Sequence, residues 1–237
     1  MDHLIIHQFE QRSNEWEEWR NPLITGSKFE EYTPKVRGSG FREKIFAFVE
    51  KQVAVDHDSN PMTWGTVQEE SGLIKYNEVT GEQAVTCGGV SNTKLPQFGY
   101  SPDGIIYNKD KTLIRKVLEM KHPTSKVFAS YVEELGMFIK NPLTEKYEFH
   151  CEQHQYGIDK IKRLDTGYYW QCVDAFLVID TAEELDFFVY DPAIPENNYL
   201  IITVTRSEVE QIIEEIMPAI LDTYEKQKAL ENYFMGL

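Results

Sequence analysis

Three residues in two short segments have the types and spacing for metal-assisted hydrolysis. Asp103 lies in a Ser-Pro-Asp-Gly turn sequence that leads into an apolar run. Glu119 and Lys121 are two residues apart, so on a strand they point to one face, while Leu118 and Met120 point to the other. Taken separately, each segment has a simpler interpretation: a solvated turn aspartate, and an exposed Glu/Lys pair on a half-buried strand.

Together the two segments form an Asp…Glu-x-Lys pattern suited to phosphodiester hydrolysis. Asp103 and Glu119 would supply the hard oxygen ligands that Mg²⁺ prefers, and the main-chain carbonyl of Met120 could add another. A metal held there lowers the pKa of a bound water and polarises the scissile phosphate. Lys121 would orient that water or stabilise the developing negative charge. The pattern therefore predicts a Mg²⁺ site, with Mn²⁺ as a substitute.

Several motifs in chain order resemble those of the phage lambda exonuclease, or YqaJ, group of the PD-(D/E)xK nuclease superfamily. The motifs are Glu15-Trp16-Glu17-Glu18-Trp19-Arg20 with Ile24-Thr25-Gly26-Ser27, Trp64-Gly65-Thr66-Val67-Gln68-Glu69, Ser101-Pro102-Asp103-Gly104, Leu118-Glu119-Met120-Lys121 with Pro123, and Glu152-Gln153-His154-Gln155-Tyr156. Each motif is weak alone, but the five occur in the family's order with compatible spacing. The resemblance covers nearly the whole chain.

The resemblance implies a role for each matching residue. Asp103 and Glu119 resemble the metal ligands, and Lys121 resembles the catalytic lysine. Gln153 resembles a glutamine that holds the attacking water or the geometry of the metal site. For Gln153 an ordinary polar helix face is the competing interpretation.

A further carboxylate at the metal site is implied in the Trp-Gly motif. The offset from Trp-Gly selects Glu69. Helical spacing, however, places Glu70 on one stripe with Val67, Leu73 and Ile74, so Glu70 is expected to face inward. The choice between the two acids therefore depends on the motif.

The opening motif implies a site for the terminal 5′-phosphate of DNA. Arg20 and Ser27 resemble the residues that receive it, and a guanidinium and a hydroxyl are suitable partners for a dianionic phosphate. The alternative is that Arg20 pairs with Glu17 or Glu18 at the surface, where an ion pair contributes little.

The leading hypothesis is a Mg²⁺-dependent exonuclease that degrades linear double-stranded DNA. The resemblance implies a phage recombination enzyme that runs 5′ to 3′, leaves single strands for an annealing protein, and forms a homotrimeric ring around DNA. A structure-specific or restriction-type endonuclease on the same core is the enzymatic alternative. A DNA-end-binding or anti-host protein is the non-enzymatic one, although the intact acids and lysine argue against it.

Composition limits the class of protein. The chain has 237 residues, 41% of them hydrophobic, and a net charge of −15, which excludes a histone-like or polybasic protein. DNA binding stays open because residues 20–52 and 109–126 are locally basic. Three scattered cysteines argue against disulfides and zinc knuckles. We expect one domain over residues 1–237, soluble and cytoplasmic, with no membrane partner.

Hydrophobic periodicity predicts an α/β (α+β) fold in which helices flank a central mixed sheet. The resemblance implies that this sheet is the restriction-endonuclease-like PD-(D/E)xK core. The expected helices are residues 41–54, 66–79, 149–163 and 206–231, the last kinked or split at Pro218. The expected strands are residues 98–107, 112–120, 168–179, 185–190 and 199–205, the last two forming an antiparallel pair.

Overall fold

The computed structural model describes residues 3–33 and 63–235. Side chains at 63–68 and 126 are outside this description. The helix expected over residues 41–54 lies outside the described residues. Within them, no helix is long and apolar enough to cross a membrane.

Helices and strands alternate irregularly along the chain. The helical elements are α1 (Asn14–Arg20), α2 (Gly26–Phe29), the 3₁₀ turn η1 (Glu30–Tyr32), α4 (Thr63–Thr80), α5 (Ser125–Leu135), α6 (Ile158–Leu164), α7 (Thr166–Val178) and α8 (Arg206–Met235). The strands are β1 (Leu4–His7), β2 (Gly89–Asn92), β3 (Gly99–Tyr100), β4 (Gly104–Tyr107), β5 (Ile114–Lys121), β6 (Met137–Lys140), β7 (Tyr147–His150), β8 (His154–Tyr156), β9 (Glu184–Tyr190) and β10 (Tyr199–Thr205).

A five-stranded mixed sheet in the order β4-β5-β9-β10-β8 forms the centre of the molecule. The pairs β4–β5 and β9–β10 are antiparallel, whereas β5–β9 and β10–β8 are parallel. The fold class and the antiparallel pairing of β9 with β10 are thus confirmed. A smaller sheet, β1-β2-β3, lies beside the N-terminal helices.

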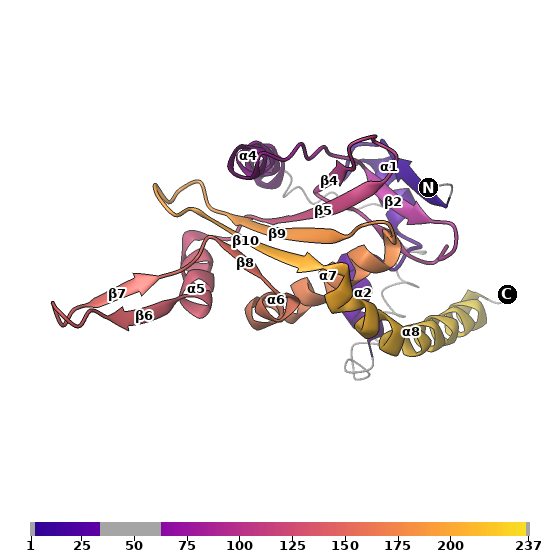
Figure 1. Cartoon of the computed structure of the whole chain (residues 1–237). Helices are drawn as coiled ribbons and strands as arrows, with labels where there is room; N and C mark the ends of the chain where they lie inside the picture. The colour runs from indigo at the N-terminus through magenta and orange to yellow at the C-terminus, as the bar shows by residue number, and fades with distance from the viewer. Residues whose placement is uncertain (1–2, 34–62, 236–237) are drawn as a thin grey trace.

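Helices cover both faces of the central sheet (Figure 1). Helix α4 lies over one face, where it meets Leu118, Met120 and Phe188. Helices α6, α7 and α2 lie on the other side of the sheet (Figure 1), and the core of that side includes Val117 and Phe187. Successive residues of β5 therefore alternate between two different environments.

The segment 168–179 was expected to be a strand, and this expectation is wrong: it forms most of the buried helix α7. Asp165 caps the helix by accepting hydrogen bonds from the backbone N–H groups of Gly167 and Tyr168. Eight of its residues are buried, so apolar side chains occur around the helix without a clear period. A long apolar run is then easily taken for a strand.

The helix expected over residues 149–163 is also partly wrong. The segment contains the end of β7, all of β8 and only then α6. Gly157, with φ of +110°, ends β8 and allows the chain to turn into the helix. Residues 158–163 belong to a helix as predicted, with Ile158 and Ile161 buried.

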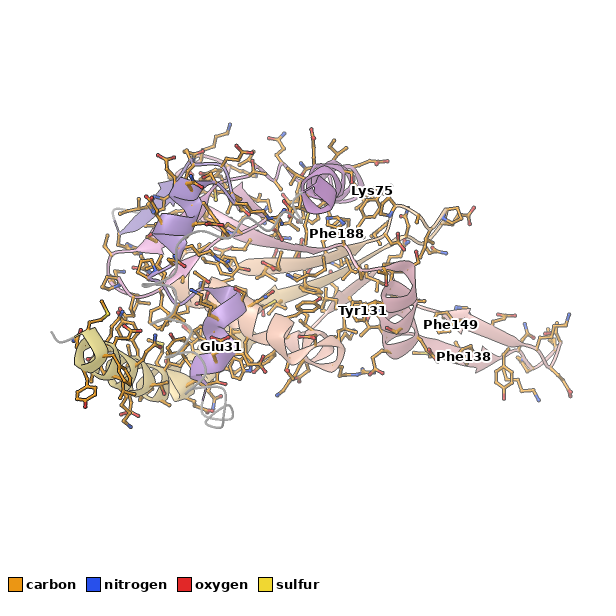
Figure 2. All side chains as sticks on the ribbon, turned by 180° about the vertical axis from the view of Figure 1, so that it is seen from behind. Glu31, Lys75, Tyr131, Phe138, Phe149 and Phe188 are labelled. Carbon is orange, nitrogen blue, oxygen red and sulfur yellow. The ribbon has the colours of Figure 1, made fainter. Side chains whose placement is uncertain are left out.

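Helix α8 runs unbroken from Arg206 to Met235 with Pro218 inside it, so the helix is not split there. The expected helix over 66–79 is confirmed as α4. The hairpin of β6 and β7 was not predicted. It projects from the body of the protein (Figure 1), and Figure 2 shows Phe138 and Phe149 on it.

Candidate active site

A change of sheet positions Asp103. Strand β3 belongs to the small sheet and β4 to the central one, and Asp103 lies in the short connection between them. Because β4 pairs with β5 in a register that sets Gly104 opposite Leu118, the turn lies beside the end of β5. The Oδ2 atom of Asp103 accepts a hydrogen bond of 2.6 Å from the backbone N–H of Met120. The turn and the strand predicted from the sequence therefore meet.

Glu119 and Lys121 point to the α7 face of the sheet. The Lys121 Nζ atom lies 2.5 Å from Glu119 Oε1, and the hydroxyl of Tyr100 donates a hydrogen bond to the other carboxylate oxygen. Lys121 also lies over the Tyr168 ring, 4.9 Å from its centroid. Both oxygens of the Glu119 carboxylate are thus hydrogen-bonded, and Glu119 is 7% exposed.

Negative charge is crowded at this site. Burial and the neighbouring carboxylate of Glu119 raise the pKa of Asp103 to about 8, although Lys121 and the Met120 N–H act in the opposite direction. Burial alone would lower the pKa of Lys121, but Glu119 and Asp103 raise it well above its usual range. Lys121 is therefore a permanent cation and a hydrogen-bond donor, and it is unsuited to act as a base.

The residues present fit a hard divalent cation in their chemistry. Two adjacent carboxylates supply oxygen donors, and the charge of Glu119 adds to the effect of burial in raising the pKa of Asp103. Among the described residues, no three His, Cys, Asp or Glu side chains are arranged as a complete metal site. The side chains of Asp103 and Glu119 would therefore supply only part of the coordination sphere of a metal ion.

Glu69 faces the same cavity as Asp103. This cavity, of about 850 Å³, is lined by residues that include Arg12, Glu69, Asp103 and Met120. Glu69 forms an ion pair with Arg12, and its charge contributes to the raised pKa of Asp103. Glu69 therefore lies close to the acid cluster, which consists of Asp103 and Glu119, but its carboxylate is paired with Arg12.

The inward orientation expected for the Glu70 stripe is met only in part. Glu70 lines the same cavity as Glu69 but is exposed, and Ile74 of the same expected stripe is 63% exposed. The helix instead turns Gly72 and Tyr76 towards the sheet, and both are buried. Leu73 and Val79 pack against the core together with Tyr76, so the inward face of α4 is displaced from the expected stripe.

Arg20 and Ser27 meet as expected. The Arg20 side chain donates a 2.5 Å hydrogen bond to Ser27 Oγ, and its guanidinium lies 4.6 Å from the centroid of the Trp16 ring. Within the described residues the Arg20 side chain thus contacts Ser27 and Trp16, and it forms no ion pair with Glu17 or Glu18. The surface-pairing alternative is therefore not supported.

Helix α7 adds polar atoms that the sequence reading missed. Oxygen atoms of Thr25, Gln171 and Asp174 are buried near Arg20 without a hydrogen-bond partner in the described residues, as is Arg20 Nε. Burial lowers the pKa of Arg20, while Glu119 and Asp174 oppose that effect, so both carboxylates face it. The available sequence signal for this polar group was the presence of Gln171 and Asp174 within an apolar segment. Unsatisfied buried groups of this kind accept water or a polar ligand.

Glycine at position 26 allows this close approach. A Cβ atom there would lie 3.0 Å from the Tyr100 ring and 3.4 Å from Gln171 Cγ. Helix α2 can therefore pack against both β3 and α7. Arg20 and Ser27 are brought in this way to the side of the site that contains Tyr100 and Glu119.

Gln153 lies away from this cluster. Its side chain donates a hydrogen bond to Asn197, at 3.2 Å, and it immediately precedes β8. Strands β9 and β10 separate β8 from β5. At about 4.8 Å per strand, that separation is roughly 14 Å.

The mixed sheet, the acid pair at the end of β5 and the adjacent lysine agree with the class of nuclease that the motifs resemble. The sequence pattern of the YqaJ-like viral recombinase domain matches residues 15–178, more than half of the chain. The chain belongs to this family. None of the curated proteins matches the sequence.

Two solved structures share the fold. One is the crystal structure of an alkaline exonuclease, LHK-Exo, from Laribacter hongkongensis, and the other is LHK-Exo in complex with dAMP. Each has a TM-score of 0.67 and 18% sequence identity, covering 94% of this chain and 96% of the other. At this identity the likeness shows the fold.

Proposed function

We propose that residues 1–237 form one deoxyribonuclease domain that degrades linear duplex DNA from its ends, 5′ to 3′, with Mg²⁺ or Mn²⁺. The observation that carries the proposal is the meeting of Asp103, Glu119 and Lys121 at the end of β5. Membership in the YqaJ-like recombinase family and the exonuclease fold of LHK-Exo support it.

In this proposal Asp103, Glu119 and the Met120 carbonyl hold the metal, with Glu69 as a further carboxylate. The metal supplies Lewis-acid activation of the scissile phosphate and of a water. Lys121, kept protonated and held by Glu119, donates to a phosphoryl oxygen or orients the attacking water. Gln153 is left outside the proposed site because two strands intervene.

The proposed 5′-phosphate site is formed by Arg20 and Ser27. The guanidinium and the hydroxyl are already joined, and Arg20 Nε is a buried donor without a partner within the described chain. A terminal phosphate would accept charge-assisted hydrogen bonds from both groups. Held there, it would fix the position of the first phosphodiester bonds relative to Glu119.

One assay tests the proposal against its alternatives. Linear and covalently closed duplexes are incubated with Mg²⁺, and the linear one carries a label on either its 5′ or its 3′ ends. We expect loss of the linear DNA alone, with the 5′ label released first. Nicking of the closed circle would indicate an endonuclease, and unchanged DNA retained on the protein would indicate an end-binding protein.

A second test concerns the metal. We expect Mg²⁺ and Mn²⁺ to support hydrolysis and Ca²⁺ to bind while supporting little, because its looser coordination positions the water poorly. Tightly bound, stoichiometric zinc in the purified protein would contradict the all-oxygen site.

Assembly and setting are separate proposals that rest on the family resemblance. We expect a ring-shaped homotrimer, acting in the cytoplasm of a phage-infected or lysogenic cell and passing single strands to an annealing protein. Light scattering coupled to size-exclusion chromatography measures the assembly, and a monomer at all concentrations would contradict the ring.

A further inference from the structure

On the face of β5 opposite Glu119, one buried carboxylate joins three strands and a helix. Asp186 of β9 is 1% exposed and accepts three side-chain hydrogen bonds. Tyr76 donates to Oδ2 at 2.6 Å, Lys116 to Oδ2 at 3.0 Å and Thr203 to Oδ1 at 2.6 Å. These donors come from α4, β5 and β10. Both oxygens of Asp186 are therefore satisfied inside the protein.

Helix α4 meets the protein core along one face. Glu69, Gly72 and Tyr76 are three and four residues apart, so they follow one another on this face. A Cβ at Gly72 would lie 2.5 Å from the His122 ring, so glycine lets the helix approach the end of β5 closely. The Tyr76 ring packs edge-on against Phe188 at 5.5 Å, and Figure 2 shows Phe188 on the sheet side of α4.

Leu73 and Val79 of α4 are partly buried against the core, so the apolar contribution to the orientation of the helix is a partial one. Ile74, on its outer side, is 63% exposed, while the polar residue Tyr76 is fully buried. Each residue of an α-helix turns it by about 100°. A rotation of one residue would therefore turn Glu69 away from Arg12 and the cavity that contains Asp103. A directional hydrogen bond from a buried tyrosine selects one orientation.

We propose that Tyr76 and Asp186 are positioning residues for Glu69. Their hydrogen bond fixes the orientation of α4 about its axis, seven residues from Glu69, so that Glu69 faces the acid cluster. The inference rests on the proposed function in one respect: it takes Glu69 to be part of the metal site. It adds to that function two residues on the opposite face of the sheet, neither of which touches the metal or DNA.

The test uses two matched variants of the full chain. Tyr76→Phe removes the hydroxyl and keeps the ring against Phe188. Thr203→Val removes a different donor to the same carboxylate, together with the 2.8 Å contact between the Thr203 hydroxyl and His154 Nε2, and leaves the Tyr76 hydroxyl in place. Circular dichroism and thermal unfolding verify that both variants fold. Tyr76→Phe loses one buried hydrogen bond and Thr203→Val loses two contacts, so Thr203→Val should lower the melting temperature at least as much as Tyr76→Phe.

Two readouts separate positioning from general stability. Amide hydrogen exchange of α4 is measured in metal-free protein, and Mn²⁺ binding is measured by calorimetry without DNA. For Tyr76→Phe we expect faster exchange over residues 69–80 and Mn²⁺ binding weakened by about tenfold. For Thr203→Val we expect both readouts close to those of the wild type. Equal changes in the two variants, or none in Tyr76→Phe, would overturn the inference.

A double-mutant cycle tests whether Tyr76 acts through Glu69. In a Glu69→Gln background, Tyr76→Phe should weaken Mn²⁺ binding no further. An additional tenfold loss there would overturn the route through Glu69. If the wild type itself does not bind Mn²⁺, the proposed metal site fails. The hydrogen-exchange comparison would then still decide whether the Tyr76–Asp186 bond orients α4.

Discussion

The two faces of strand β5 each contain a lysine beside buried acids, yet their electrostatics differ. On the α4 face Lys116 contacts Asp186 at 3.0 Å and Glu184 at 2.9 Å, and Asp186 has two further donors. On the α7 face Lys121 compensates two carboxylates, and the pKa of Asp103 is raised to about 8. In the first cluster both oxygens of Asp186 have donors, whereas in the second, burial and the charge of Glu119 raise the pKa of Asp103.

This difference separates a structural network from a candidate catalytic one. A buried acid with donors on both oxygens needs nothing more from solvent or ligand. Crowded carboxylates with too little positive charge favour a bound proton or a cation, and a divalent metal supplies the larger compensation. Strand periodicity places Lys116 and Lys121 on different faces but does not reveal which of the two clusters is complete.

Replacing one lysine on each face should produce opposite outcomes. Lys121→Ala should slow hydrolysis of linear duplex by about 10²–10³-fold or more while DNA binding persists, because a donor to the reacting phosphate is lost. Lys116→Ala should instead lower stability by about 3–5 kcal/mol, because it leaves a buried acid with less compensation. Single-turnover rates and urea unfolding of both variants provide the comparison. A similar rate loss per folded molecule in both would remove the distinction.

The comparison extends to the Arg20–Ser27 pair. The wild type should prefer 5′-phosphorylated over 5′-hydroxyl duplex, and Arg20→Ala should lose most of that preference. A charge-assisted contact contributes about 1.5–3 kcal/mol, so the loss amounts to roughly ten- to hundredfold in rate. Competing the two labelled substrates in one reaction measures it. If the wild type cleaves both alike, Arg20 and Ser27 are not a phosphate anchor.

The smallest expected effect is a pH dependence of the metal-free protein. The pKa of Asp103 is raised in the folded state, so the folded chain keeps a proton that the unfolded chain releases between about pH 4 and pH 8. Stability without metal should therefore fall as pH rises through this range, and Asp103→Asn should flatten the dependence. Thermal unfolding in EDTA at several pH values measures it. Identical pH dependence in both proteins would contradict the crowding of Asp103.

The local sequence was sufficient to predict the placement of Asp103, Glu119 and Lys121, which lie in two short segments. Turn chemistry predicted the position of Asp103, and the two-residue period predicted a shared face for Glu119 and Lys121. The α7 side was not predictable in this way. An all-round apolar helix has no distinctive period, so α7 was expected to be a strand and the placement of Gln171 beside Gly26 was missed.

The order of the strands in the central sheet was also not predictable from the sequence. The motif at Gln153 suggested a helix next to the acids, whereas the chain there enters β8 at the far edge of the sheet. Strand order depends on contacts between distant segments, which local patterns do not encode. The orientation of α4 failed for a related reason, since it depends on Tyr76 reaching an acid 110 residues away.

The central claim is that Asp103 and Glu119 hold the catalytic metal, and Glu119→Gln tests it most directly. Mn²⁺ binding by calorimetry and hydrolysis of linear duplex are measured on the same preparations of wild type and variant. We expect the folded variant to bind Mn²⁺ far more weakly and to cleave at least 10²–10³-fold more slowly than the wild type. Near-wild-type hydrolysis by Glu119→Gln would contradict the metal-site assignment.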